Sequence, residues 1–503
     1  MTQFLTRPLA IRAKTLDFWL FNVAVPLTFW ILAQAFIPMD QIFQVNSDEG
    51  IELIKSDLYR DGYQLYTQVW NDQPPLPTVL WTAWLQWVGH TVAQARHLTL
   101  LFATLLVWAF GQSVRMTVGK WPALLGILWL TATSYFLQLS TSVMMGQPSL
   151  AMVMTAVYAL LQFQQSLQWG WLVCSGLLFA IALQLKSFVA FLVPVFIIAL
   201  WLPIRGGGSR RLQSGLLRIG VWLVALGIAF GMATVLLPPQ NLDQTVGGHF
   251  NRNLEQAYGW VEDLPDFFEM FIHDPDFWIL CGFSAWASNQ WLQRFPLFPK
   301  LWLVFALLTL WIHRPIWYHY YALISIPLVW LTAYAARELY GFVREALKGK
   351  TLKQALRDKR TATVAGFLCL SLVAIPIKYW VTFDQNQLLL KNSVAFQQGL
   401  EQIMAERDRT RWLFTDVPIY GFYANLKVPP ETAVFSSKRI ESGNLTPAQL
   451  NEIVDRYRPE QIALGRFKSV RRALQSNLDR HYDLKYMNQR VRIYRRRAAQ
   501  KRI

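Results

Sequence analysis

Long apolar runs alternate with short polar connections over the first three quarters of the chain. A helix needs about 20 mostly apolar residues to cross the hydrocarbon core of a bilayer. Eleven runs approach or meet this requirement, near residues 17–38, 98–114, 122–140, 149–165, 169–185, 188–204, 217–237, 276–292, 300–313, 318–336 and 362–381. The pattern therefore predicts a polytopic α-helical membrane protein with about eleven transmembrane helices.

Residues 76–93 are apolar enough to be a twelfth span, but they are rich in Trp and contain Gln86, Gly89 and His90. Such a composition suits a helix that lies at the membrane surface. If this helix does not span, the basic clusters of the later loops share the side of the N-terminus. These clusters are Arg115/Lys120, Arg205–Arg218, Arg294/Lys300 and Arg337–Arg360, the last with eight Lys/Arg against three acidic residues. The positive-inside rule then predicts a cytoplasmic N-terminus.

With that sidedness, an odd number of spans places the chain from about residue 382 outside the cytoplasm. We expect a multi-pass protein of the plasma (inner) membrane with two parts: a transmembrane domain, 1–381, whose first external loop is 40–97, and an extracytoplasmic domain, 382–503. The tail shows a strand–helix–strand pattern. "RWLFTD", "EQIALGRF" and "VRIYRRR" are strand candidates, and Thr446 and Pro447 begin a helix. The tail is thus predicted to be a small α/β domain.

Composition supports the membrane assignment. The 503 residues are 53% hydrophobic and only 16% charged, against about 25% charged in a typical soluble domain. The net charge is +17, and the tail from 382 holds 22 Lys/Arg against 12 Asp/Glu. Anionic lipid headgroups explain a basic domain beside a membrane more simply than nucleic acid does. The three cysteines lie in apolar runs without a Cys-x-x-Cys pair, which indicates neither zinc nor a disulfide framework.

The densest acidic patch follows the first apolar run directly. Between Gln44 and Trp81 lie Asp48, Glu49, Glu52, Asp57, Asp61 and Asp72, followed by a Pro-Pro pair. A surface loop can be acidic for solubility alone. Acidic residues beside the membrane, together with external basic residues elsewhere, instead suggest an active site at the outer membrane face.

This loop resembles the first external loop of GT-C fold glycosyltransferases of the family 39 type, which include protein O-mannosyltransferases and lipid A aminoarabinose transferases. The matching positions are Asp48-Glu49, Gly62, Tyr66, Pro74-Pro75-Leu76 and Arg96. In that family the Pro-Pro pair begins a juxtamembrane helix, in agreement with the charge argument. The likeness extends through about residue 381, but beyond the loop it rests on hydropathy alone.

The resemblance implies an inverting transfer of a sugar from a polyprenyl-phosphate donor to a hydroxyl acceptor, which is a lipid, a glycan or a protein. An attacking hydroxyl must lose its proton, so a carboxylate beside it acts as general base. We assign this role to Asp48, with Glu49 orienting the acceptor or Asp48. Cations must hold the phosphate charge, and Arg314, His319 and Arg96 are the candidates. The alternative for Arg314 and its neighbours is an ordinary aromatic belt at a helix mouth.

Further positions of the external loops are expected to place the acceptor or the loop itself: Tyr66, Asp72, Gln73, His249 and Arg252. Within the resemblance, Asp72 and His249 could hold a divalent metal, although a lone His and Asp are more often polar loop residues. No cofactor is otherwise implied. Gln73 and Gln147 depart from the charged residues of relatives, which leaves the sugar and the acceptor open.

Two other readings remain. Lys186 interrupts an apolar hairpin and is expected to extend toward the membrane surface. The chain as a whole could instead be a multi-span transporter or lipid flippase with an external domain. A transporter places ionisable residues near mid-membrane in broken helices, whereas most spans of this chain lack charges.

Overall fold

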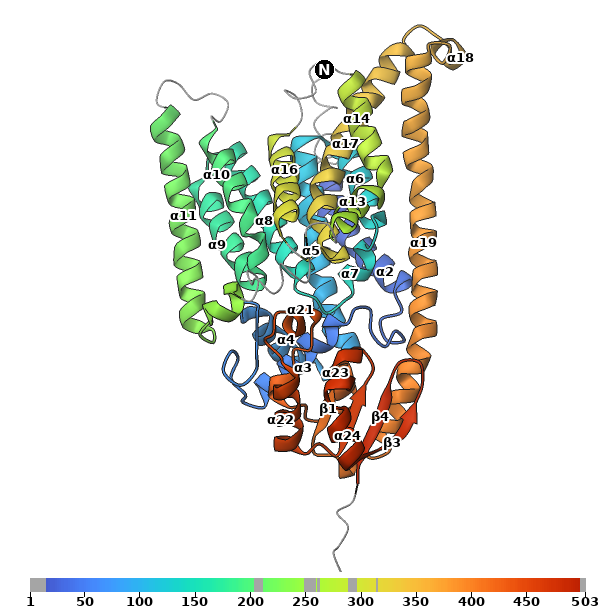
Figure 1. Cartoon of the computed structure of the whole chain (residues 1–503). Coiled ribbons are helices and arrows are strands. Elements are labelled where there is room, and N and C mark those ends of the chain that lie inside the picture. The colour runs from blue at the N-terminus through green and yellow to red at the C-terminus, as the bar shows by residue number, and fades with distance from the viewer. Residues whose placement is uncertain are drawn as a thin grey trace, which may run out of the picture.

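The computed structural model describes residues 15–202, 211–247, 259, 263–287, 296–313 and 315–497. A long helical bundle occupies one end of the molecule and a small α/β domain the other (Figure 1). This arrangement agrees with the predicted fold class.

In its described residues, each of the eleven predicted spans is mostly helical. Their helices are η1 (Leu20–Ala24) with α2 (Val25–Phe36), α5 (Val92–Thr117), α6 (Lys120–Ala132) with α7 (Phe136–Ser140), α8 (Gly146–Ser166), α9 (Trp169–Leu185), η2 (Ser187–Leu192) with α10 (Val193–Trp201), α11 (Arg211–Leu236), α14 (Pro275–Ala287), α16 (Leu297–Ile312), η4 (Tyr318–Tyr320) with α17 (Tyr321–Ala346), and α19 (Lys359–Met404). Among the described residues, five helices are individually long and apolar enough to cross a membrane. The count of eleven stays a prediction.

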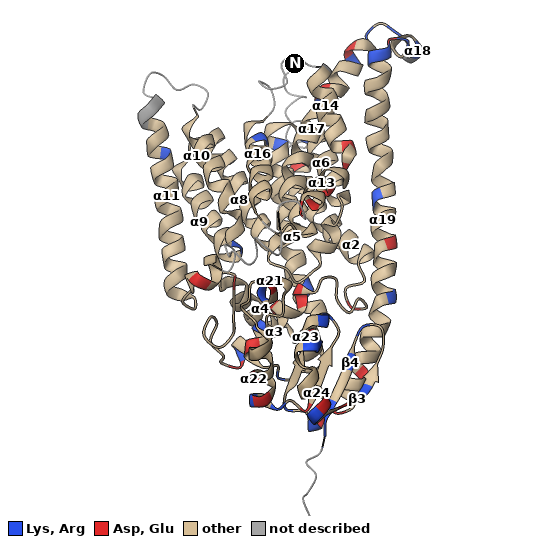
Figure 2. Cartoon of the chain, viewed as in Figure 1, with Lys and Arg blue, Asp and Glu red and all other residues tan. Residues whose placement is uncertain are grey.

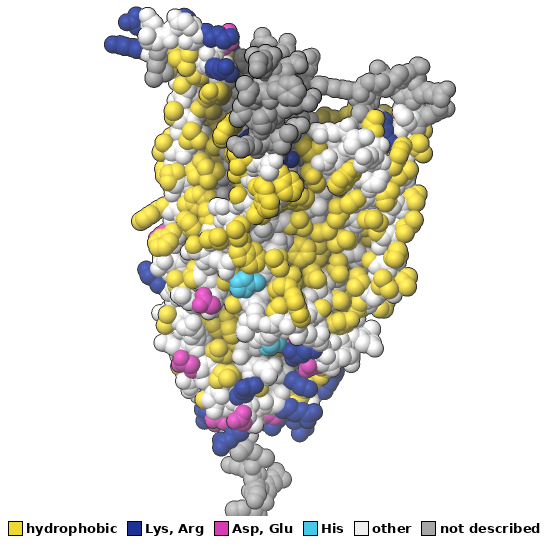
Figure 3. Space-filling view, turned by 180° about the vertical axis from the view of Figure 1, so that it is seen from behind, with side chains coloured by type: hydrophobic (Ala, Val, Ile, Leu, Met, Phe, Trp, Pro, Cys, Tyr) yellow, Lys and Arg dark blue, Asp and Glu magenta, His cyan; other side chains and the backbone are white. Residues whose placement is uncertain are grey.

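Small side chains let neighbouring helices of the bundle approach closely, as in membrane interiors generally. On α9, a Cβ added to Gly176 would lie 2.8 Å from the carbonyl oxygen of Trp222 on α11. The Ser175 hydroxyl donates to the Ala156 carbonyl at 2.8 Å and accepts from the Trp222 indole at 3.2 Å. Ser175 thus links three helices through paired polar groups, while on the face drawn in Figure 3 a broad apolar band covers the bundle.

Charged residues concentrate at the two ends of this band (Figure 2). At the end opposite the α/β domain, Lys120 pairs with Asp17, and Arg337 donates to the Val118 carbonyl at 2.7 Å. The short helix α18 (Leu352–Ala355), within the basic segment, lies at the same end (Figure 1). The start of the first described helix and these basic segments therefore share one side, as the charge argument expects.

Helices α3 (Asp48–Arg60) and α4 (Leu76–Val88) lie between the bundle and the α/β domain (Figure 1). With 13 residues, α4 is roughly 20 Å long, too short to cross a bilayer. One face of α4 is buried and the other is exposed. Trp81 is fully buried and donates to the Ala95 carbonyl at 3.3 Å, whereas Trp87 is 80% exposed. This agrees with the predicted juxtamembrane helix.

The C-terminal domain contains a four-stranded sheet of order β1-β2-β4-β3. Its strands are β1 (Leu413–Thr415), β2 (Gln461–Leu464), β3 (Tyr482–Met487) and β4 (Arg492–Arg496), and its helices are α20 (Ile419–Ala424), α21 (Ser437–Glu441), α22 (Pro447–Tyr457), α23 (Lys468–Ala473) and α24 (Gln475–His481). The three predicted strands are present, and Thr446 caps α22 in a capping box with Gln449. The sequence pattern missed β3, an edge strand with only one buried residue.

Helix α19 runs without interruption from Lys359 to Met404. The predicted domain boundary at residue 382 therefore falls inside a helix. Its apolar first half borders the bundle, and its second half leads into the α/β domain, where the Ser393 hydroxyl accepts the backbone N–H of Phe43 at 2.8 Å. One continuous helix thus connects the two parts of the protein.

Shorter helices complete the chain: η3 (Asp243–Gly247), α13 (Leu264–Ile272), η5 (Arg407–Arg409) and η6 (Pro430–Thr432). The first of these packs on the loop that follows α3. The Gln244 side chain accepts the backbone N–H of Asn71 at 3.0 Å and donates to the Tyr66 carbonyl at 2.8 Å. The segment after α11 thereby fixes the loop that carries Asp72.

Candidate active site

A cavity of about 730 Å³ lies where the helical bundle meets the C-terminal domain. Its wall is drawn from α3, the connections before α8 and after α9, η4, and two segments of the C-terminal domain. The charged side chains in this wall are those of Asp48, Glu52, Lys55, Asp72, Lys186, Lys438 and Arg466. A cavity that joins an apolar bundle to a polar domain can admit a lipid from one side and a water-soluble group from the other.

Asp48 is the first residue of α3, and its backbone N–H donates to the Asn46 side chain at 2.8 Å. A helix N-terminus favours a negative charge. Burial nevertheless raises the pKa of Asp48, against the lowering effects of Arg466, Lys186 and Lys55. A carboxylate whose pKa is moved toward neutrality is better matched to accept a proton from a hydroxyl. The structure therefore places the predicted general base in a suitable environment.

Four cations line the cavity, and two of them are matched by carboxylates. Lys55 pairs with Glu52 at 2.9 Å, and Lys438 pairs with Asp72 at 3.2 Å. Within the described part of the chain, Lys186 and Arg466 form no ion pair. The four cations in the described wall thus outnumber its three carboxylates, which leaves the cavity with an excess of positive charge for an anionic ligand.

Lys186 lies in the connection between α9 and η2, outside both helices. Its ammonium group lies 5.2 Å from the ring centre of Tyr320, within range of a cation–π contact. Burial lowers the pKa of Lys186 to about 8, although Asp48, Asp72 and Glu52 raise it. The side chain thus faces the cavity, and the expectation that it extends toward the membrane surface stays a prediction.

An aromatic wall formed by the segment before α17 closes the bundle side of the cavity. Trp317, Tyr318, His319 and Tyr320 all line it. The Asn46 side chain donates to the Tyr318 hydroxyl, which ties this wall to the residues before Asp48. His319 thus lies where a donor-phosphate ligand is expected, while Arg314 lies outside the described residues.

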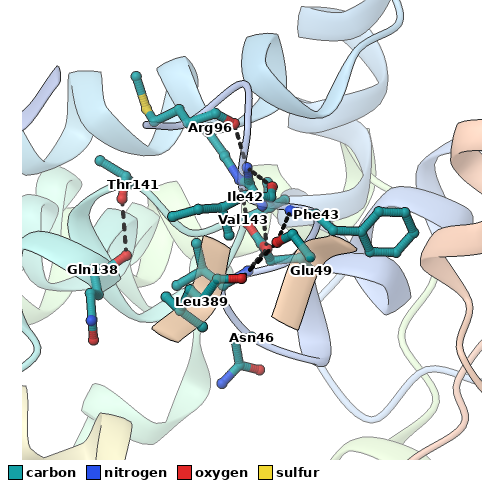
Figure 4. A network of polar contacts seen from close by, with 12 residues as sticks. Ile42, Phe43, Asn46, Glu49, Arg96, Gln138, Thr141, Val143 and Leu389 are labelled. Atoms are coloured by element: carbon teal, nitrogen blue, oxygen red, sulfur yellow. Dashed lines mark hydrogen bonds and ion pairs between the residues drawn. The ribbon is translucent and has the colours of Figure 1, made fainter. Parts of the chain in front are cut away.

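Glu49 and Arg96 do not line the cavity. Their side chains have no exposed surface and form a bidentate ion pair, Nε to Oε1 at 2.9 Å and Nη2 to Oε2 at 2.8 Å (Figure 4). Glu49 also accepts the backbone N–H groups of Val45 at 2.6 Å and Val143 at 3.0 Å. Arg96 donates to the carbonyls of Met39 and Ile42.

This pair ties the first external loop, the start of α5 and the loop before α8 together. The expectations that Glu49 acts in catalysis and that Arg96 binds phosphate do not fit this placement. The reason is geometric: consecutive residues of a helix project about 100° apart, so only one member of the Asp48-Glu49 pair can face the cavity. The other is turned into the protein, where it needs a buried cation.

Of the predicted loop residues, Asp72 and Gln73 line the cavity, whereas Tyr66 supports them from behind. The Tyr66 hydroxyl donates to the Gln73 carbonyl at 2.7 Å, and the Asn71 side chain donates to the same carbonyl at 2.9 Å. Tyr66 has a left-handed backbone with φ of 67°, a strained conformation for a non-glycine residue. These contacts fix the chain between α3 and the Pro-Pro pair.

His249 and Arg252 lie outside the described residues. Within the described ranges no group of three His, Cys, Asp or Glu side chains could hold a metal ion. Asp72 is instead paired with Lys438. The metal suggested for Asp72 and His249 thus stays untested and enters no step of the proposed reaction.

A smaller chamber of about 30 Å³ adjoins the cavity and shares Lys186, His319 and Tyr320 with it. Gln147, in the first turn of α8, also lines this chamber and is only 2% exposed. Neither polar atom of its side-chain amide has a hydrogen-bond partner among the described residues. The uncharged residue at this position therefore borders the site rather than the bulk solvent.

The C-terminal domain contributes residues that the sequence did not assign to the site. Val434, Ser436, Ser437, Lys438 and Arg466 line the cavity. A signal for Arg466 was present: it lies near the end of the predicted strand "EQIALGRF", as Asp416 does in "RWLFTD", and in the structure both residues come just after the strands β2 and β1. Polar residues after neighbouring parallel strands meet at one sheet edge, where ligands commonly bind.

The bundle, the two short helices beside it, the cavity and the small α/β domain together form an architecture that resembles the GT-C fold of membrane glycosyltransferases. A family model described as dolichyl-phosphate-mannose-protein mannosyltransferase matches residues 72–236. No curated protein sequence matches the chain.

Solved structures of this architecture resemble the whole chain. ArnT from Cupriavidus metallidurans, bound to undecaprenyl phosphate, matches with a TM-score of 0.62 and 15% identity over 95% of this chain and 98% of that one. Its apo structure matches with a TM-score of 0.61 and 16% identity over 96% and 98%. The oligosaccharyltransferase of Archaeoglobus fulgidus matches with a TM-score of 0.53 and 10% identity over 89% and 70%. The predicted resemblance is confirmed at the level of the fold.

Proposed function

We propose that this chain is an integral-membrane glycosyltransferase that moves a sugar from a polyprenyl-phosphate donor to a hydroxyl acceptor. The observation that carries the proposal is the position of Asp48. Its carboxylate lies in a cavity at the junction of bundle and polar domain, under the influence of Lys186 and Arg466. The match of the family model and the shared fold support the same class of reaction.

The reaction is a single displacement with inversion. The acceptor oxygen attacks the anomeric carbon, and the bond from that carbon to the phosphate oxygen breaks. The polyprenyl phosphate leaves with the electron pair, and Asp48 takes the proton of the acceptor hydroxyl. Because phosphate is a weak base, the leaving oxygen needs a nearby cation rather than a proton donor.

Lys186 is the cation best placed for the donor phosphate. It lies at the end of two apolar helices, beside His319 and Tyr320, where a lipid from the surrounding membrane would present its phosphate. One relative of the same fold holds undecaprenyl phosphate, so the proposed donor lipid is of this polyprenyl type. Arg314 remains a predicted further ligand.

The chain is a multi-pass membrane protein, and we propose that its C-terminal domain faces the outside of the cytoplasm. The basic residues at the opposite end of the bundle, such as Lys120 and Arg337, support this orientation. The transporter alternative lacks support, because the charged side chains of the cavity gather at one end of the bundle.

The test is the binding of undecaprenyl phosphate to the full chain in nanodiscs, followed by native mass spectrometry. Lys186→Gln is expected to weaken binding about 10- to 100-fold, the loss of one hydrogen bond to a charged group. Lys391→Gln is the matched control, since Lys391 is exposed on α19. Unchanged affinity in Lys186→Gln would remove Lys186 from the donor site. A wild-type chain that binds no undecaprenyl phosphate would contradict the proposed function.

A further inference from the structure

Arg466 is held in place by a rigid backbone. It follows β2 in the C-terminal domain, where the buried carboxylate of Asp416 accepts three consecutive backbone N–H groups. These come from Gly465 at 2.7 Å, Arg466 at 3.0 Å and Phe467 at 2.7 Å. A Cβ at Gly465 would lie 2.0 Å from the Arg490 carbonyl oxygen, so the turn requires glycine.

The guanidinium group of Arg466 uses only some of its hydrogen-bond donors within the described protein. One N–H group donates to the Phe435 carbonyl at 3.0 Å, and the group lies 4.8 Å from the ring centre of Phe467. Arginine has five N–H donors in a fixed plane, and in the described structure Arg466 meets no carboxylate in an ion pair. The side chain lines the cavity with donors left for a ligand.

Lys186 and Arg466 enter the cavity from different parts of the protein. Lys186 comes from the membrane bundle, and Arg466 comes from the polar C-terminal domain. Both act on the charge of Asp48. Two separate cationic groups therefore act on Asp48, one from the apolar bundle and one from the polar C-terminal domain.

A polyprenyl-phosphate sugar is a phosphodiester with a single negative charge, and its lipid must lie against the apolar bundle. Lys186 matches that charge on the bundle side. Arg466 belongs to the domain from which a water-exposed acceptor would approach. Arginine binds phosphate and carboxylate groups through two parallel hydrogen bonds, so an acceptor with such a group would be both held and oriented.

We infer that the acceptor carries an anionic group, a phosphate or a carboxylate, near the hydroxyl that is glycosylated, and that Arg466 binds this group. The inference rests on the proposed glycosyltransferase function and adds to it the chemical class of the acceptor. Asp416 is a positioning residue for Arg466, because it fixes the backbone from which the guanidinium projects. The C-terminal domain thereby contributes to the selection of the acceptor.

The experiment measures the binding of small anions to the full chain in phosphatidylcholine nanodiscs saturated with undecaprenyl phosphate. The probes are inorganic phosphate and acetate, with equilibrium dialysis of the radiolabelled anion as the readout. We expect at least one of the two anions to bind while the lipid stays bound. Arg466→Gln is expected to weaken this binding at least tenfold, and Arg466→Lys to restore most of it.

Arg472→Gln is the matched control, since Arg472 is an exposed arginine of α23 in the same domain. It should bind the anions like the wild type. Displacement of the anion by undecaprenyl phosphate would mean a single shared anion site and would overturn the inference, as would wild-type anion binding in Arg466→Gln. Retained lipid binding in Arg466→Gln shows that the variant is folded. Failure of the lipid itself to bind would count against the proposed function, separately from the anion result.

Discussion

Replacing Glu49 by Gln removes the charge from an ion pair that has no exposed surface. Four hydrogen bonds converge on this carboxylate, two from Arg96 and two from the backbone of Val45 and Val143. Removal of one partner of a buried pair leaves the other charge without compensation, at a cost of about 3–5 kcal/mol. Glu49→Gln and Arg96→Met should each lower the stability of the chain by this amount.

The double variant Glu49→Gln/Arg96→Met completes the thermodynamic cycle. It leaves no uncompensated charge, although the carbonyls of Met39 and Ile42 lose their donor at about 1–3 kcal/mol for each group that becomes unsatisfied. The double variant should therefore be less destabilised than the sum of the two single variants. Thermal unfolding of the purified chains in nanodiscs, with reversibility checked, gives the three values.

The same variants distinguish a structural Glu49 from a catalytic one. If Glu49 ties the loops together, the fraction of Glu49→Gln that stays folded binds undecaprenyl phosphate with wild-type affinity. A Glu49→Gln chain with wild-type thermal stability and a large loss of sugar transfer would refute this reasoning. It would return Glu49 to the catalytic role that the sequence suggested.

The remaining predictions concern orientation and pH. In a cysteine-free background, single cysteines at the exposed positions Gln86 and Arg480 should both react with an impermeant thiol reagent added from outside the cell; protection of either would contradict the proposed topology. Because Asp48 must be ionised to accept a proton and its pKa is raised, kcat/KM should fall on acidification at a pH above the usual carboxylate range. Because Lys186 binds phosphate only when protonated, kcat/KM should also fall as the pH rises through about 8; Lys186→Arg should move this alkaline limb upward, and an unmoved limb would assign it to another group.

Most of the fold could be predicted from the sequence because a lipid bilayer offers no hydrogen bonds to the backbone, so a chain that crosses it must form helices or a closed barrel. Apolar runs had to become helices, and the Thr446-Pro447 start of α22 followed from capping chemistry. The boundary between the two domains was harder to predict from the sequence. The apolar run ends near residue 382, but α19 continues as a helix to Met404. Likewise, β3 was missed although Tyr482, Leu484 and Tyr486 alternate with Asp483 and Lys485, because the run is short and lies at an edge of the sheet, where only Tyr482 is buried.

The site was predicted only in part, for reasons of three-dimensional arrangement. Asp48 and His319 could be proposed from their sequence context. The pairing of Glu49 with Arg96 could not, because it joins residues 47 positions apart and depends on which side of α3 each carboxylate faces. Arg466 was not assigned either: its place near the end of a predicted strand was a signal, but nothing in the hydropathy pattern shows that the C-terminal domain closes the cavity.

Sugar transfer by Asp48→Asn tests the central claim most directly. Asn has nearly the same shape as Asp but cannot take up the hydroxyl proton, and positioned general bases contribute typically 10²–10⁴-fold to rate. The measurement is transfer of labelled sugar from a polyprenyl-phosphate donor by chains in nanodiscs, with donor affinity and thermal stability measured on the same samples. We predict at least a hundredfold loss of transfer with donor affinity and stability close to the wild type. Wild-type transfer by Asp48→Asn would contradict the account.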